Sequence, residues 1–86
     1  MEEFKEAVSS VLRSIRAEKH MTQQEVAEKS GLDVMTIGRY ENNPNTIFLD
    51  KLDKILLVYG VDCYYFFNMV NAKKHKNKSD IDYENI

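Results

Sequence analysis

The stretch TQQEVAEKSGLDVMTIGRYE, residues 22–41, decides the fold of this chain. Thr22 can cap a helix, and Glu25, three residues later, completes a capping box. Gly31 stands where this helix must end in a residue that tolerates a positive φ. Asp33 can cap a second helix directly afterwards. The pattern therefore predicts two short helices joined by a tight turn.

Two short helices set at a steep angle form a helix-turn-helix, the arrangement that places a helix in the DNA major groove. In the second helix, 34–41, Ile37, Tyr40 and Glu41 are expected to face inward. Glu41 is the only acid between residues 34 and 49, so its burial would leave the outer face without a carboxylate. The motif therefore favours DNA as a partner.

The overall charge is unusual for a DNA-binding domain, which commonly carries a basic excess. The net charge is −2, and acids outnumber bases in the first seventy residues. Net charge governs overall affinity and salt response, whereas the local surface decides whether a phosphate can approach. The charge therefore argues for weak electrostatic attraction without excluding DNA.

The length of 86 residues allows one small domain. No apolar stretch is long enough to span a membrane, and the N-terminus MEEFKEAV is acidic where a secretory signal would be basic. The single cysteine, Cys63, excludes an internal disulfide, fits a reducing compartment and is expected in the core. We therefore expect a cytoplasmic protein.

Helical spacing of apolar residues predicts three further helices, at about 3–19, at 48–59 and from 63 to 72. Their expected inward residues are Phe4, Val8, Val11, Leu12 and Ile15, then Leu49, Leu52, Ile55, Leu56 and Tyr59, then Cys63, Phe66, Phe67 and Val70. Gly60 ends the second of these helices, and Asp62 can cap the third. The fold predicted is an all-α, five-helix domain of residues 1–71, followed by a polar, disordered tail of residues 72–86.

Arg16 and Glu41 each project along the apolar face of their own helix. An unpaired buried charge costs several kcal/mol, and a bidentate Arg–carboxylate pair offsets much of that cost. We therefore predict a structural ion pair between Arg16 and Glu41. The alternative is that both side chains reach solvent at the edges of their faces.

The run LRSIRAEKHMTQQEVAEKSGLDVMTIGRYENNPNTIFLDKLDKILLVYGVD, residues 12–62, resembles the Cro/cI-type helix-turn-helix family, also called phage-repressor-like or the xenobiotic-response-element (XRE) family. The matching positions are Leu12, Arg16, Thr22, Gln23, Val26, Ala27, Gly31, Ile37, Glu41, Asn42, Leu49, Leu52, Ile55, Gly60 and Val61. The resemblance implies a lambda-repressor-like fold, double-stranded DNA as the partner and a homodimer.

The resemblance also implies roles for individual residues. Thr22 and Gln23 would contact phosphate at the start of their helix. The positions that would face DNA on the next helix and loop are Val34, Met35, Thr36, Gly38 and Arg39, then Asn42, Asn43 and Asn45.

This chain departs from many relatives at the base-reading positions. Val34 and Met35 suit contact with thymine methyl groups, which leaves Arg39 as the candidate for a bidentate guanine contact. Gly38 costs about 1 kcal/mol in a helix interior and would allow close backbone approach. The family's basic glycine turn is replaced by Asn43-Pro44. Alternatively, Arg39 is only solvated, and Val34 and Met35 form the rim of a protein-binding surface.

The last predicted helix is apolar nearly all the way round, more than one small core can absorb. The family resemblance places this helix near the dimer interface, so Tyr64, Tyr65 and Met69 are predicted there; the alternative is that they cover the end of the first helix. The run KKHKNK, residues 73–78, is expected to be a solvated tail, with auxiliary phosphate contact as the alternative.

The function predicted is a sequence-specific, homodimeric repressor that reads a palindromic operator with residues 34–41. The alternative is a helix-turn-helix protein-interaction module, or an antitoxin-like partner-binding protein with weak DNA affinity. No nucleophile–base–acid set or glycine-rich phosphate loop is present, so neither an enzyme nor a cofactor is expected. His20 and His75 have no ligand partners at metal spacing, so no metal site is predicted.

Overall fold

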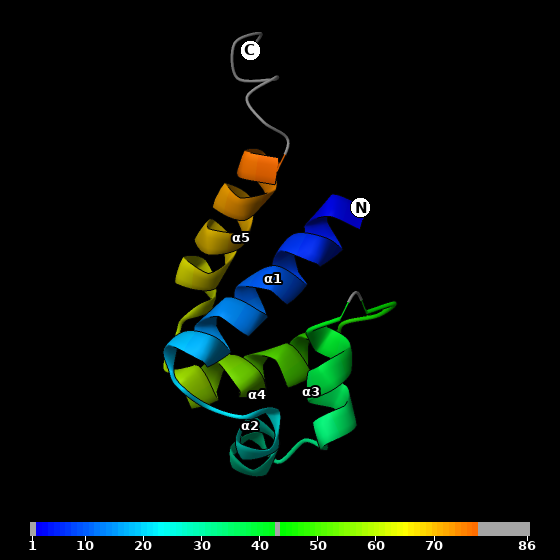
Figure 1. The fold of residues 1–86 in the computed structure, drawn as a ribbon, viewed down its shortest axis with the longest axis vertical. Helices are drawn as coiled ribbons and strands as arrows, with labels where there is room; N and C mark the ends of the chain where they lie inside the picture. The colour runs from blue at the N-terminus through cyan, green and yellow to red at the C-terminus, as the bar shows by residue number, and fades with distance from the viewer. Residues whose placement is uncertain (1, 43, 78–86) are drawn as a thin grey trace, which may run out of the picture.

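The structure, a computed structural model, describes residues 2–42 and 44–77. This part of the chain contains five helices and no strand (Figure 1). The helices are α1 (Glu2–Glu18), α2 (Gln23–Ser30), α3 (Val34–Tyr40), α4 (Leu49–Tyr59) and α5 (Cys63–Asn77). The predicted all-α, five-helix fold is confirmed.

The local signals that predicted the helix ends act as expected. Thr22 and Glu25 form a complete capping box at the start of α2, and Gly31 ends α2 at φ 79°. The Asp33 side chain accepts a hydrogen bond from the backbone of α3, and Gly60 ends α4 at φ 71°. These ends depend on residues within one turn of each other, so the sequence alone specifies them.

Helices α1 and α5 lie side by side, and α2, α3 and α4 form a group below them in the view of Figure 1. All five helices contribute to one core. Its buried apolar residues are Ala7, Val8, Val11, Leu12 and Ile15 of α1, Val26 and Ala27 of α2, Ile37 and Tyr40 of α3, Leu52, Ile55, Leu56 and Tyr59 of α4, and Phe66 and Val70 of α5. This core holds α3 in place while leaving its other side in solvent.

Two residues predicted in the core lie at the surface. Leu49 is 74% exposed, although it shares a helix face with Leu56, because α4 begins beyond the edge of the core. Cys63 is exposed at the first position of α5. Both are the first residues of their helices, where neighbouring elements do not cover them.

The tail was predicted to be disordered from residue 72, and this is wrong for residues 72–77. Helix α5 continues to Asn77, and the Lys74 Nζ lies 6.0 Å from the centroid of the Phe4 ring. Adding alanine and lysine residues to an existing helix costs little free energy, because the helix is already nucleated. A lysine side chain can also pack its methylene groups on an aromatic ring. Residues 78–86 lie outside the described residues.

No single helix in the described ranges is long and apolar enough to cross a membrane. The pair α4 and α5 reaches the length and composition of a span only when taken together, across a bend of 99°.

Candidate nucleic-acid interface

The start of α2 is a surface position held by reciprocal hydrogen bonds. The Thr22 Oγ1 accepts from the Glu25 backbone N–H at 3.0 Å, and the Thr22 backbone N–H donates to the Glu25 Oε1 at 2.8 Å. Thr22 is exposed, and Gln23 is half-buried beside it. The Thr22 and Glu25 backbone N–H groups are thus paired within the capping box, with the Glu25 carboxylate beside them.

The outer face of α3 presents apolar side chains and one cation. Met35 is 68% exposed, Val34 is 37% exposed and Arg39 is exposed. Gly38 lies between them along the helix and is half-buried. These four positions therefore lie together on one side of α3.

Thr36 does not share this face, so the expectation that its side chain points outward is wrong. It is 4% exposed, because it lies one turn before the buried Tyr40 on the same side of α3. The Thr36 Oγ1 instead lies 3.5 Å from the Arg39 Nη2. Thr36 therefore contacts the guanidinium end of the Arg39 side chain.

Carboxylates are sparse around the outer face of α3. Glu41 is 2% exposed, so it presents no charge to solvent on this face. Asp33, at the helix start, is the nearest exposed acid on α3, and it interacts with Arg39 and Lys51. The hydrogen bond from the Thr36 backbone N–H is the main cause that lowers the Asp33 pKa below its usual value. The Asp33 carboxylate thus caps the start of α3, and the Arg39 side chain remains exposed to solvent.

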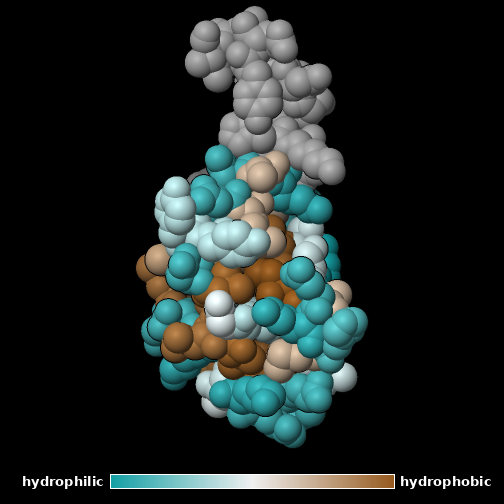
Figure 2. Space-filling view, turned by 90° about the vertical axis from the view of Figure 1, so that its left-hand side faces the viewer, coloured by the Kyte–Doolittle hydropathy of each residue, from teal (hydrophilic) through white to brown (hydrophobic). Residues whose placement is uncertain are grey.

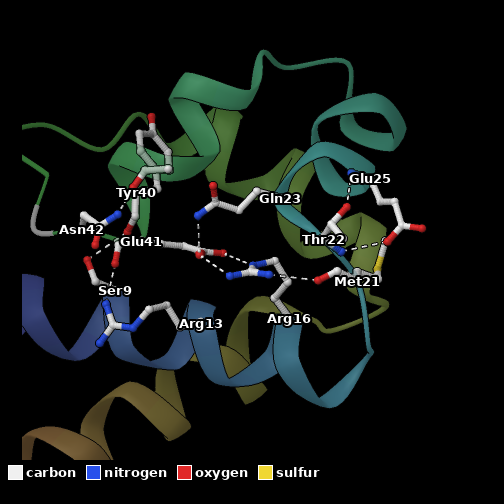
Figure 3. A network of polar contacts seen from close by, with 11 residues as sticks. Ser9, Arg13, Arg16, Met21, Thr22, Gln23, Glu25, Tyr40, Glu41 and Asn42 are labelled. Atoms are coloured by element: carbon white, nitrogen blue, oxygen red, sulfur yellow. Dashed lines mark hydrogen bonds and ion pairs between the residues drawn. The ribbon is translucent and has the colours of Figure 1, made fainter.

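The predicted ion pair between Arg16 and Glu41 is present and bidentate (Figure 3). The Arg16 Nε donates to the Glu41 Oε2 at 2.8 Å, and the Arg16 Nη2 donates to the Glu41 Oε1 at 3.0 Å. The hydrogen bond to Glu41 is the main cause that raises the Arg16 pKa above its usual value. The pair ties α1 to the end of α3.

Gln23 joins this ion pair, which the sequence did not predict. The Gln23 Nε2 donates to the Glu41 Oε1 at 3.0 Å, across 18 positions of the chain (Figure 3). The Gln23 Oε1 lies over the bare Cα of Gly38, 3.7 Å from where a Cβ would stand. Gln23 of α2 is therefore in contact with α3 at Gly38 and at the capping residue Glu41.

Ser9 and Arg13 also hold the end of α3, and sequence reasoning missed both. The Ser9 Oγ donates to the Tyr40 carbonyl oxygen at 2.9 Å, and the Arg13 Nη1 donates to the Glu41 carbonyl oxygen. Ser9, Arg13 and Arg16 recur at helical spacing along one side of α1, the signal by which they could have been found.

The loop after α3 turns back on its helix. The Asn42 Nδ2 donates to the Gly38 carbonyl oxygen at 2.8 Å, and Asn45 is exposed. Asn43, predicted to contact the DNA backbone, lies outside the described residues. The Asn42 side chain thus caps the C-terminal end of α3.

A second surface feature is the apolar side of the molecule that carries α5. Figure 2 faces this side and shows apolar surface at its centre, bordered by hydrophilic residues. Tyr64 is 77% exposed and Tyr65 57% exposed, whereas Met69 is half-buried beside Ile15 of α1. Tyr65 and Met69 line one hollow with Ile15, Glu18 and Lys19 at the end of α1, as the alternative expected, yet both tyrosines keep more than half of their surface in solvent.

No three His, Cys, Asp or Glu side chains gather closely enough to hold a metal ion within the described residues.

Comparisons with known proteins point the same way. The family model described as Helix-turn-helix matches residues 12–66. No relative was found among the curated proteins. A crystal structure of the wild-type restriction-modification controller protein C.Esp1396I is 34% identical to this chain, with a TM-score of 0.78, and the match covers 85% of this chain and 95% of that one.

The same controller protein, as a tetramer in complex with its natural 35-base-pair operator, matches with a TM-score of 0.76 at 34% identity, over 83% of this chain and 93% of that one. The clp gene regulator ClgR from Corynebacterium glutamicum shares the fold, with a TM-score of 0.83 at 22% identity, over 92% of this chain and 84% of that one. With the family model covering more than half of its residues, the chain belongs to the XRE-type, phage-repressor-like helix-turn-helix family of DNA-binding transcriptional regulators.

Proposed function

We propose that this regulator is a homodimer that reads a palindromic operator in the cytoplasm by placing α3 in the major groove, and that it acts as a repressor. The observation that carries the proposal is the outer face of α3, where Val34, Met35 and Arg39 are accessible and the acid Glu41 is buried. The similar controller protein C.Esp1396I binds its operator as a tetramer, which supports an assembly of several copies on DNA.

Each exposed residue then has a role set by its chemistry. Arg39 offers two parallel N–H donors to guanine, while Val34 and Met35 offer apolar contact to thymine methyl groups. Thr22 and Gln23 contact a phosphate at the start of α2.

The remaining contacts are to the DNA backbone. Gly38 lets the phosphate–sugar chain approach α3, and Asn42 and Asn45 contact phosphates from the loop. Asn43 is included from the sequence alone.

The dimer is proposed to form through α5. Tyr64 and Tyr65 are large side chains left in solvent, and Met69 lies beside them at the edge of the core. A two-fold axis through this surface would set two α3 helices about one DNA turn apart, roughly 34 Å.

A salt titration of DNA binding tests the function. Each phosphate neutralised by the protein contributes a slope of about −0.9 in log affinity against log salt. We expect steep loss of affinity for the DNA flanking the protein's own gene, and weaker binding to an unrelated duplex of equal length. Absence of binding to both duplexes at low salt would contradict the proposal.

The net charge of −2 and the exposed apolar side carrying α5 favour a second candidate, a protein-interaction module or antitoxin-like protein with weak DNA affinity. In that case the titration gives little or no DNA binding, and a different protein occupies the α5 surface. Selecting binding sites from a random DNA pool distinguishes the two, since only an operator-reading protein enriches a palindrome.

A further inference from the structure

Glu41 is the centre of a buried polar network that reaches the surface at the start of α2 (Figure 3). Its carboxylate is 2% exposed and accepts three hydrogen bonds, two from Arg16 and one from Gln23. Charge-assisted hydrogen bonds of this kind fix the geometry of both partners. Glu41 is therefore able to hold the Gln23 side chain in one orientation.

The Gln23 amide keeps capacity for a ligand while it is held. Its Nε2 carries two N–H donors, and the hydrogen bond to the Glu41 Oε1 at 3.0 Å uses one of them. The side chain is half-buried and begins at the first residue of α2. The second N–H is thus available to an acceptor at the helix N-terminus.

Arg16 holds the backbone at the same place. Its Nη1 donates to the Met21 carbonyl oxygen at 2.9 Å, directly before Thr22, while its Nε and Nη2 bind Glu41. One ion pair therefore fixes the start of α2 twice, through the backbone at Met21 and through the side chain of Gln23.

We propose that Glu41, held by Arg16, is a positioning residue for DNA binding: it presents the Gln23 amide to a phosphate and keeps this clamp in register with α3. This rests on the proposed function, in which Gln23 contacts the DNA backbone. A side chain that is already oriented loses less freedom on binding, so the network contributes to affinity without touching DNA.

A double-mutant cycle tests the coupling. Gln23→Ala is expected to weaken binding to operator and unrelated DNA alike, by about tenfold, the effect of one hydrogen bond to a charged group. Glu41→Met keeps an unbranched side chain of similar length and removes both acceptor oxygens. In the Glu41→Met background, Gln23→Ala should weaken binding by less than about threefold, because the amide is no longer oriented.

Ser9→Ala supplies the matched control. It also removes a buried hydrogen bond between α1 and the end of α3, that from the Ser9 Oγ to the Tyr40 carbonyl oxygen, but it touches neither Gln23 nor Met21. In the Ser9→Ala background, Gln23→Ala should still weaken DNA binding by about tenfold. A full effect of Gln23→Ala in the Glu41→Met background as well would overturn the proposal.

A measurement on the wild-type protein covers the case in which Glu41→Met does not fold. The side-chain NH2 resonances of Gln23 in the free protein should differ from those of the urea-unfolded chain and shift further on adding operator DNA. Gln23 resonances in the free protein that match those of the unfolded chain would overturn the positioning role. A wild-type protein that does not bind DNA would overturn the proposed function. This outcome is separate from failure of the positioning role, because it is seen without any variant.

Discussion

At the scale of single residues, Arg39 of α3 and Gln23 of α2 differ in their surroundings, and the proposed function gives them different roles, base reading and phosphate binding. Arg39 is exposed, its guanidinium lies 3.5 Å from the Thr36 Oγ1, and its charge interacts with Asp33. Gln23 is half-buried and tied to Glu41. The two side chains should therefore respond differently to mutation.

Arg39→Ala is expected to cost about 1–3 kcal/mol of operator affinity and to relax specificity at one base pair, because a bidentate guanine contact is lost. Binding-site selection with the variant measures this. Gln23→Ala is the control, since it should weaken all sequences alike. An unchanged base preference in Arg39→Ala would show that Arg39 does not read a base.

Tyr59 gives a stability prediction of unusual sign. Its Oη is buried and has no hydrogen-bond partner among the described residues, and an unsatisfied buried polar group costs about 1–3 kcal/mol. Tyr59→Phe should therefore leave the free energy of unfolding unchanged or raise it by about 1 kcal/mol, as measured by urea unfolding. A loss of stability in Tyr59→Phe would show that the hydroxyl has a partner, such as a bound water.

The same residue predicts a pH dependence. Burial, followed by the nearby Glu41 charge, raises the pKa of Tyr59 from 10.0 to about 12. Because the pKa is raised in the folded state, the unfolded chain releases the Tyr59 proton first as the pH rises. The part of the stability that depends on a neutral Tyr59 is therefore complete below pH 10 and is lost as the pH rises through about 12. The Phe variant should lack this part of the alkaline loss.

At the scale of elements, α3 is a seven-residue helix that depends on its neighbours. It is too short to be stable alone, so its position comes from the Asp33 cap, from Ile37 and Tyr40 in the core, and from α1 at its C-terminal end. A residue in α3 that lowers helix stability therefore needs a reason, and Gly38 is such a residue.

Gly38→Ala is expected to raise the free energy of unfolding by about 1 kcal/mol, the difference in helix propensity. A Cβ at this position would meet only the Gln23 Oε1, at 3.7 Å, which is ordinary contact. Affinity for DNA should fall, because the added methyl group stands between the DNA backbone and α3. Binding as tight as that of the wild type would show that close approach at Gly38 is not required.

At the scale of the whole molecule, the proposed function assigns DNA binding and dimer formation to two different surfaces. The α2–α3 surface faces DNA in the proposed function, and the side carrying α5 keeps apolar residues in solvent (Figure 2). Exposed apolar patches on small proteins commonly mark interaction sites.

The double variant Tyr64→Asp with Tyr65→Asp should be a monomer in sedimentation equilibrium, because two charges cannot be buried at a two-fold interface without partners. Both residues are more than half exposed in the single chain, so the fold should survive. Leu57→Asp is a control at another exposed apolar position, on α4. An unchanged mass in the tyrosine variant would remove these two residues from the interface.

The amino-acid sequence by itself determined the features that depend on neighbours along the chain. Thr22, Gly31 and Asp33 fixed the helix ends, and helical spacing identified the core faces and the inward Arg16 and Glu41. These signals act within one or two helical turns, so no knowledge of the packing was needed.

Only the tertiary structure decided which predicted faces are covered. Leu49 and Cys63 have the spacing of core residues yet lie in solvent, and Thr36 was expected outside yet is buried. The contacts of Gln23 with Glu41, and of Ser9 with Tyr40, join residues 18 and 31 positions apart. Such contacts depend on how whole helices dock, and a periodic pattern along one helix carries no information about the distance to another.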